Sequence, residues 1–422
     1  KLTFEILFLL LANIRQACAA GELLKFTSQI FGEDSPTGSI VQPPAFFKAR
    51  MKMKWQAFPA LGKIIDDAFM ASGLARKWRG FRPLALDGST CQLPPTKEVW
   101  SHFPPITPRE DYANKVPVGR FSYLYDPLNH LVVGAALDKY SEGELTHAET
   151  LFADVGEGDL VLMDRGYSAT WVMASLDSKG ARFCVRMKSV WKCFEPFVRS
   201  GLRDQAITIP IQGNARKDCL ARGVSARTLR VRLVRVDLEN GEVEVVATNL
   251  RDTAAFPAEI FKELYHWRWF VEEAYKSAKS FMSLENFSGK SVLSVMRDFY
   301  AKVFAGNLLT ILSLQARREL DEKNAEILDA FDAETSGDDQ ADDEKTATPR
   351  LHKLNRTIGI SVHRMAAVPL LFRRVGAALA SALDAMTAKL LAAPTPIRPG
   401  RSFERQVKYP SAKFKMNYKP TL

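Results

Sequence analysis

The chain has 422 residues, 46% of them hydrophobic and 25% charged, a composition typical of a globular protein and not of a disordered one. Its formal net charge of +10 favours a polyanionic partner, although charge alone does not separate nucleic acid from a membrane surface. The five cysteines form no CxxC pair and the six histidines form no zinc-binding pattern, which argues against a disulfide framework and against zinc. We interpret the thiols as reduced, as in a cytoplasm.

The first 80 residues are predicted to be helical. Residues 1–14 resemble a signal peptide, but Glu5 and Arg15 interrupt the apolar run, which is also too short to cross a bilayer. A buried helix is the favoured interpretation. The sequence does not begin with Met, and we expect a truncated start.

A further helix is predicted within residues 45–58, where basic side chains alternate with apolar ones. Two interpretations stay open. The segment is either an ordinary surface helix with long cationic side chains, or a helix whose Lys48, Arg50 and Lys52 contact DNA phosphates.

From about residue 81 the pattern changes to the short apolar runs of strands. Two of these strands are predicted to end in an aspartate: Asp87 follows Leu-Ala-Leu, and Asp164 follows Leu-Val-Leu-Met. Gly88 and Gly166 come soon after, and glycine lets another group approach closely. Either aspartate alone is readily explained as a turn residue. Because ligand sites collect at strand ends in such folds, the pair favours a site.

Strands and helices are mixed around these two strands. We predict a hairpin over residues 119–138, helices over 144–153 and 169–179, and a strand over 181–188. Residues 189–248 are expected to be β-rich. The order of strand, hairpin, helix and strand is that of a ribonuclease H-like core, an α/β fold with a mixed sheet flanked by helices.

A helix is predicted over residues 264–281, with Tyr265, Arg268, Glu272 and Lys279 within an arc of about 60°. Lys276 lies at the edge of this arc. The polar arc is either the solvated face of an amphipathic helix or one side of a site. Tyrosine normally buries much of its surface area, so its presence argues against a solvated face.

Together, Asp87, Asp164 and Glu272 form a set of oxygen ligands without histidine or cysteine. Such a set suits Mg²⁺ or Mn²⁺. Two such ions can clamp an in-line phosphoryl displacement. The sequence therefore predicts a two-metal phosphodiester site.

The rest of the chain is predicted to be helical to residue 315 and again from 351, with a basic tail over 398–422. Residues 320–350 are acidic and polar, and we expect a disordered loop or linker there. The segment 331–349 alone carries seven acidic residues and one lysine.

The spacing Tyr-x2-Arg-x3-Glu-x6-Lys, together with LALDGST around Asp87 and LMDRGY around Asp164, resembles the DDE transposases of the insertion-sequence-four family. The likeness covers about residues 40–415 and includes RPGRSFERQVK near the end. It implies a helical DNA-binding region over 1–80. A ribonuclease H-like catalytic core over 81–315 follows, with a β-rich insertion over 189–248. The acidic linker over 320–350 then leads to a helical C-terminal region over 351–422.

The resemblance also implies roles for particular residues. Asp87, Asp164 and Glu272 would be the catalytic carboxylates that hold two Mg²⁺ or Mn²⁺ ions. DNA contacts would come from Tyr265, Arg268, Lys276, Lys279, Arg165, Trp191, Lys48, Arg50 and Lys52. Trp191 stands apart in this set, because it is either a base-stacking residue or part of a small β core.

The implied function is transposition, in which transposon ends in double-stranded DNA are cut and the 3′-hydroxyls are joined to target DNA. A homodimer is expected because two ends must meet in one complex, acting on the nucleoid in a bacterial cytoplasm. Two alternatives stay open: a DNA-binding protein of transposon descent that has lost its chemistry, and a ribonuclease H-like nuclease without strand transfer.

Overall fold

The computed structural model describes residues 3–13, 19–31, 41–104, 116–238, 241–335, 349–373 and 375–398. The chain divides into two compact units. One comprises residues 1–54, 280–288 and 304–422, and the other comprises residues 55–279 and 289–303. The sheet lies wholly in the second unit, which begins at residue 55.

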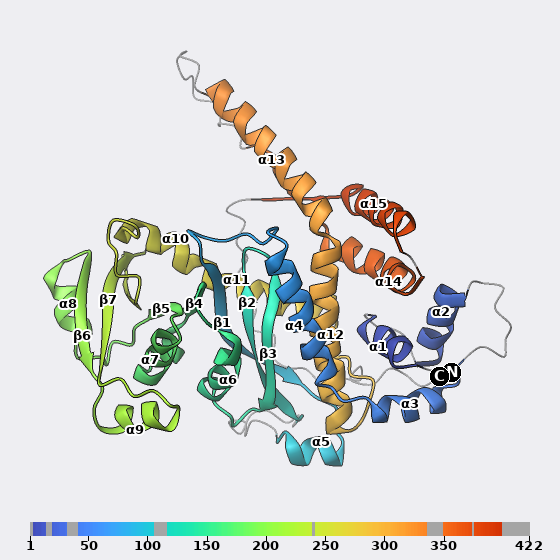
Figure 1. Cartoon of the computed structure of the whole chain (residues 1–422), viewed down its shortest axis with the longest axis horizontal. Helices are drawn as coiled ribbons and strands as arrows, with labels where there is room; N and C mark the ends of the chain where they lie inside the picture. Colours follow the sequence, from blue (N-terminus) through green and yellow to red (C-terminus); the bar gives the residue numbers. More distant parts are fainter. Residues whose placement is uncertain are drawn as a thin grey trace. The chain divides into compact units, whose positions relative to one another are not determined.

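The second unit is organised on one eight-stranded mixed sheet (Figure 1). The strands are β1 Arg82–Gln92, β2 Val118–Asp126, β3 Leu131–Lys139, β4 Asp159–Met163, β5 Arg182–Arg186, β6 Asp204–Pro210, β7 Thr228–Asp237 and β8 Val243–Thr248. Their order is β3-β2-β1-β4-β5-β8-β7-β6. The first three form an antiparallel meander, and β4 and β5 run parallel to β1. This arrangement confirms the predicted mixed α/β fold with a ribonuclease H-like core.

One detail of the sheet differs from the prediction, and another adds to it. β1 continues to Gln92, so Asp87 does not end its strand, because β2 goes on pairing with β1 after β4 has stopped. The predicted β-rich segment belongs to the same sheet as the core. β8 pairs with β5, so β8, β7 and β6 extend the same sheet, with two helices between the strands.

Helices cover both faces of the sheet, and the alternation of side chains along each strand assigns residues to a face. Leu86 and Met163 belong to the core that α6 (Glu144–Leu151) and α7 (Thr170–Ser178) cover, together with α8 (Phe194–Ser200) and α9 (Gly213–Ala221). Leu160 and Leu162 face the opposite core, which is closed by α10 (Phe261–His266). The site described below depends on this division.

A buried ionic cluster holds the start of β1. Arg82 pairs through Nη2 with Asp66 Oδ1 of α4 (Ala57–Ala71) at 2.5 Å and through Nε with Asp126 Oδ2 at the end of β2 at 2.9 Å. Asn129 donates to the same Asp126 carboxylate at 2.7 Å. Buried charges are tolerated when they are paired in this way.

The first unit is mainly helical in its described residues. Its helices are α1 Phe4–Ala12, α2 Ala19–Phe31, α3 Pro43–Lys52, α13 Leu314–Thr335, α14 Arg356–Arg373 and α15 Ala377–Leu391, with the end of α12 (Val292–Leu312). Five residues of α1 are buried, which confirms the buried helix predicted at the start. Helices from the two ends of the chain pack together: Arg364 of α14 pairs with Glu22 of α2 at 3.5 Å.

The predicted acidic linker is wrong over its first half. α13 continues as a helix to Thr335, because residues 314–335 are rich in Leu, Glu, Ala and Arg, which favour helix whatever their net charge. The rest of the predicted linker up to 348, and the basic tail from residue 399, lie outside the described residues. Two short strands, β9 (His352–Lys353) and β10 (Thr395–Pro396), pair antiparallel.

Over the ranges that the structure describes, no helix is long and apolar enough to cross a membrane. Four cysteines fall in these ranges, and all four are free thiols, three of them buried.

Candidate active site

The two predicted aspartates follow a register pair of neighbouring parallel strands. Leu86 of β1 is in register with Met163 of β4, so Asp87 and Asp164 follow side by side where β4 ends. Neighbouring strands lie about 4.8 Å apart. Since Leu86 and Met163 face α6 and α7, alternation directs both aspartates to the other face, which α10 covers.

The segment that carries Glu272 lies on this face, but it is not one regular helix as predicted. It consists of α10, a 3₁₀ turn at Trp267–Trp269, α11 (Phe270–Lys276) and a π-helical turn at Ser277–Phe281. The predicted polar arc is also not solvated, because Tyr265 and Arg268 are buried whereas Trp269 is 48% exposed. A π turn within a helix is often found at a functional site.

Arg268 connects two of the three carboxylates. Its Nη1 lies 3.4 Å from Asp87 Oδ2, and its Nη2 lies 3.8 Å from Glu272 Oε1. The guanidinium also stacks 4.3 Å from the centre of the Trp269 ring. One buried cation therefore neutralises both acids and brings Asp87 and Glu272 to the same place.

Tyr275 is a residue of the site that sequence reasoning missed. Its hydroxyl donates to the carbonyl oxygen of Asp87 and accepts from the backbone N–H of Tyr123 at 3.2 Å. It thus ties α11 directly to the strand position of Asp87. Tyr275 lies three residues after Glu272 on the same helix, and this spacing is the sequence signal that could have placed it near the site.

The remaining predicted residues of this region have different surroundings. Lys279, in the π turn, donates to Ser89 Oγ at 2.9 Å. Lys276 is exposed and pairs with Glu273 at 2.5 Å. Arg165 is exposed directly after Asp164, whose Oδ1 accepts from Gly166 N–H at 2.8 Å. All of these residues belong to the unit that contains the sheet.

The site contains a fourth carboxylate that was not predicted. Glu144, at the start of α6, approaches from the other face of the sheet. Its Oε1 would lie 2.6 Å from a Cβ added at Gly88, and its Oε2 would lie 3.6 Å from a Cβ added at Gly166. The two glycines therefore leave room for this side chain.

Electrostatics at the site suit a cation. Burial raises the pKa of Asp87 to about 6. The Gly88 N–H and the Arg268 guanidinium act in the opposite direction, while the nearby Asp164 and Glu144 carboxylates raise the pKa further. Carboxylates crowded together in this way bind hard divalent ions through oxygen.

The donor set fits Mg²⁺ or Mn²⁺, but the side chains do not converge as they stand. Within the described part of the chain no three acidic, histidine or cysteine side chains are placed to share one ion. The carboxylates of Asp87 and Asp164 accept hydrogen bonds from the backbone N–H groups of Gly88 and Gly166. The carboxylate of Glu272 pairs with Arg268. Binding of an ion therefore requires these carboxylates to turn away from their present partners.

We expect divalent-cation affinity to fall as pH decreases through about 6, because protonated Asp87 cannot act as a ligand. The raised pKa also means that ionised Asp87 opposes folding. Its stabilising contribution is complete below pH 3.8 and is lost as pH rises through about 6. Mn²⁺ titrations by calorimetry between pH 5 and 8 measure the affinity. Equal affinity at pH 5 and pH 7.5 would contradict this expectation.

The structure corrects one predicted DNA contact in α3. Arg50 is 2% exposed and donates through Nη1 to Ser288 Oγ at 2.6 Å, whereas Lys48 and Lys52 are exposed. The buried side of α3 carries Phe46 and Arg50. Arg50 is a packing residue, because its buried guanidinium is bonded to Ser288 of the same unit.

Trp191 is half-buried. It packs against the core beneath α7 and α8, so part of its ring already has a structural use. The core interpretation and the base-stacking interpretation are both compatible with this position.

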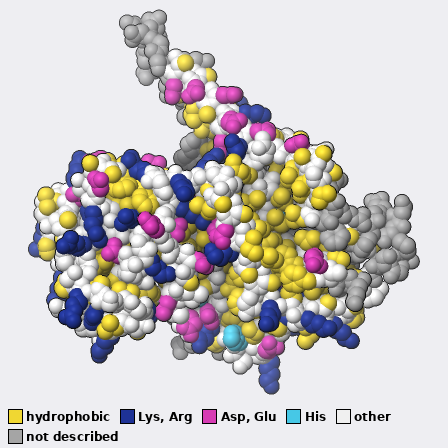
Figure 2. Space-filling model, viewed as in Figure 1, with side chains coloured by type: hydrophobic (Ala, Val, Ile, Leu, Met, Phe, Trp, Pro, Cys, Tyr) yellow, Lys and Arg dark blue, Asp and Glu magenta, His cyan; other side chains and the backbone are white. Residues whose placement is uncertain are grey.

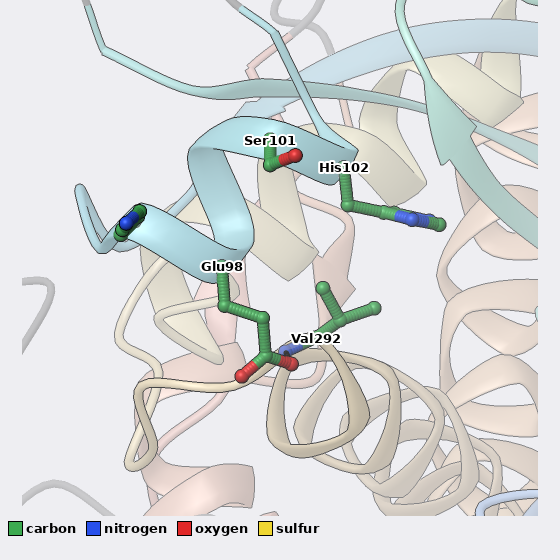
Figure 3. Close-up of a pocket in the computed structure, with 5 residues that line it drawn as sticks. Glu98, Ser101, His102 and Val292 are labelled. Atoms are coloured by element: carbon green, nitrogen blue, oxygen red, sulfur yellow. Dashed lines mark hydrogen bonds between the residues drawn. The ribbon is translucent and has the colours of Figure 1, made fainter.

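A surface pocket elsewhere in the same unit carries no comparable chemistry. Lys97, Glu98, Ser101 and His102 of α5 (Lys97–His102) line it together with Val292 (Figure 3). Glu98 accepts from Val292 N–H at 2.9 Å and so caps the first turn of α12. This carboxylate has a structural role.

Comparisons with known proteins identify the family of this chain. A family model described as the transposase DDE domain matches residues 78–308. Over 278 residues the chain is 24% identical to the transposase InsG for insertion sequence element IS4 of Escherichia coli (strain K12). That match covers 64% of this chain and 60% of the relative, so the chain spans less than two thirds of the relative's length.

Among solved structures, the piggyBac transposase synaptic complex with hairpin DNA aligns with a TM-score of 0.36 and 10% identity, over 99% of this chain and 82% of that one. A similarity this low carries no argument about the site. The family match is of another kind: it covers more than half of the residues and includes all three carboxylates. The chain belongs to the transposase DDE domain family.

Proposed function

We propose that this protein is an active, metal-dependent transposase that cuts DNA at transposon ends and joins the freed 3′-hydroxyls to target DNA. One observation carries the proposal. Asp87 and Asp164 follow the register pair Leu86 and Met163 of two neighbouring parallel strands, and Arg268 ties Glu272 to Asp87. This arrangement of three carboxylates from distant parts of the sequence supports the proposal.

In this proposal Asp87, Asp164 and Glu272 hold two Mg²⁺ or Mn²⁺ ions. When bound, such ions lower the pKa of an attacking water or hydroxyl and stabilise the leaving oxygen. The protein positions the carboxylates through Tyr275, which fixes the backbone at Asp87. Arg268 is the cation that these carboxylates would exchange for metal, and it is then free to contact a phosphate.

DNA would lie against the side of the site that exposes cations. Lys279, Lys276 and Arg165 are candidates for phosphate contacts, with Tyr265 packed beneath Arg268. Residues 188–237 are also basic, with eleven Lys and Arg residues and four Asp and Glu residues. Figure 2 shows dark blue side chains over the region of α8, α9, β6 and β7. Such a surface attracts a polyanion and makes binding sensitive to salt.

Further contacts are proposed on the same reasoning. Trp191 would stack on a base with the exposed part of its ring, and Lys48 and Lys52 would contact backbone phosphates. A homodimer is proposed because two transposon ends must be held in one complex.

An assay with end-bearing DNA tests the proposal. Labelled duplex carrying the inverted repeats that flank the gene, incubated with the full chain, a target plasmid and Mg²⁺, is expected to give strand-transfer products. Hydrolysis without joining would indicate a nuclease. Binding without either reaction would indicate a DNA-binding protein that has lost its chemistry. Either of these two results contradicts the proposal.

A further inference from the structure

The carboxylate of Glu144 lies beside both aspartate-bearing segments, although it comes from the opposite face of the sheet. Measured from the point where a Gly166 Cβ would stand, Asp164 Oδ1 is at 2.9 Å and Glu144 Oε2 is at 3.6 Å. Both oxygens therefore lie beside the same backbone position. On the other side, a Gly88 Cβ would lie 2.8 Å from Glu144 Cδ, so any larger residue after Asp87 would displace this side chain.

One basic residue partly balances Glu144. Arg120 of β2 lies 3.7 Å away, with its Nη1 facing Glu144 Oε1, and its guanidinium also stacks 4.6 Å from the centre of the Tyr140 ring. A separation of 3.7 Å is long for a charge-assisted hydrogen bond, which is ordinarily below about 3 Å. The ion pair therefore does not account for the placement of Glu144 between the two glycines.

A second observation points to a ligand at the same place. The Tyr167 side chain is fully buried, and its hydroxyl has no hydrogen-bond partner of standard geometry among the described residues. Burial raises the pKa of Tyr167, and the nearby charges of Glu144, Asp87 and Asp164 raise it further, while the Ser122 hydroxyl acts in the opposite direction. The Ser122 hydroxyl is also bonded to His147 Nδ1 at 2.7 Å.

A buried hydroxyl without a partner of standard geometry calls for an explanation, and a catalytic or binding role is one. Near three carboxylates, the natural partner is a carboxylate oxygen turned by metal binding, or a water bound to the metal. The Tyr167 phenol is thus placed to donate to the site once an ion has drawn the carboxylates together.

We propose that Glu144 supplies a fourth carboxylate to the divalent-cation site, holding the ion together with Asp164, while Tyr167 donates to the carboxylate or water on that side. The proposal rests on the metal site in the proposed function and deepens it. In this proposal Glu144 lies next to Asp164 in the site, whereas Glu272 and Arg268 lie next to Asp87.

Metal binding by the full chain without DNA tests this directly. Mn²⁺ alone is titrated by calorimetry into the unchanged protein and into E144Q, D164N and E149Q. Glu149 lies on the same helix, is exposed and pairs with Arg222 at 3.0 Å, so E149Q makes the same charge change away from the site. We expect E144Q to weaken Mn²⁺ binding by about 10-fold or more and E149Q to change it by less than about twofold.

A second variant and a second measurement separate ligation from a structural role. E144D keeps the charge but withdraws the carboxylate by one methylene, and its affinity is expected to lie between those of E144Q and the unchanged protein. Without metal, E144Q is expected to melt no earlier than the unchanged protein, because it removes a like charge beside Asp164.

Two results would overturn the assignment of Glu144. One is Mn²⁺ affinity of E144Q within about twofold of the unchanged protein while D164N binds weakly, which leaves the metal site intact without Glu144. The other is a lower melting temperature of metal-free E144Q with unchanged affinity, which shows a structural role. Unchanged affinity in D164N as well would overturn both this assignment and the metal site of the proposed function.

Discussion

Replacing Asp87 by Asn, Asp164 by Asn or Glu272 by Gln is expected to lower strand cleavage by at least about 10³-fold and to leave DNA binding within a few-fold. Each amide removes a charged ligand and keeps the volume of the side chain. A loss of this size corresponds to about 4 kcal/mol of transition-state stabilisation, which is what a metal clamp supplies to phosphoryl transfer. Single-turnover cleavage of labelled end-bearing DNA measures the rate, and gel retardation measures binding.

The matched control for this series is Glu273→Gln. Glu273 is adjacent to Glu272, but its carboxylate pairs with Lys276 and not with Arg268. Cleavage by E273Q is expected to stay within a few-fold of the unchanged protein. If any of the three site variants cleaved as fast as E273Q, that residue would have no place in the catalytic set.

Replacing Arg82 by Met is expected to destabilise the protein by about 3–5 kcal/mol. The Arg82 and Asp126 side chains are 6% and 0% exposed, so the variant leaves a buried carboxylate without its cation. Because the cluster holds the start of β1, part of the loss should appear as weaker pairing between β1 and β4. Urea unfolding followed by circular dichroism measures the change.

Lys63→Met is the control for Arg82, since Lys63 belongs to the same helix as Asp66 and pairs with Asp67 on the surface at 3.2 Å. Both side chains of that pair are more than half exposed, and its loss should cost less than about 1 kcal/mol. Combining Arg82→Met with Asp126→Asn should recover part of the stability. Equal effects of Arg82→Met and Lys63→Met would show that the buried cluster does not stabilise β1.

The sequence alone was enough to identify the elements with strong local patterns. Asp87 and Asp164 stood out because each follows an unbroken apolar run, which a buried strand requires. The four positions from Tyr265 to Lys279 stood out because their spacing places them on one side of a helix. In both cases neighbouring residues carry the whole signal, so no knowledge of distant contacts was needed.

Burial within a helix was not decided locally. In α3 both Phe46 and Phe47 are aromatic and several residues are basic, yet Phe46 and Arg50 are the ones that pack inward. Which side of a helix is buried depends on the surface against which it packs. The same reason explains why the arc with Tyr265 and Arg268 faces the sheet.

What the sequence by itself determined about this protein is the mixed α/β class and the helical regions before and after the sheet, and it singled out the three carboxylates as candidates. The tertiary structure alone decided that β8 extends the sheet from β5, that Tyr275 fixes the backbone of Asp87, and that Glu144 lies beside Gly88 and Gly166. Each of these depends on strand register and packing between segments far apart in the chain. Such contacts produce no periodic pattern in the sequence, because the neighbours of a side chain across a sheet depend on the whole fold.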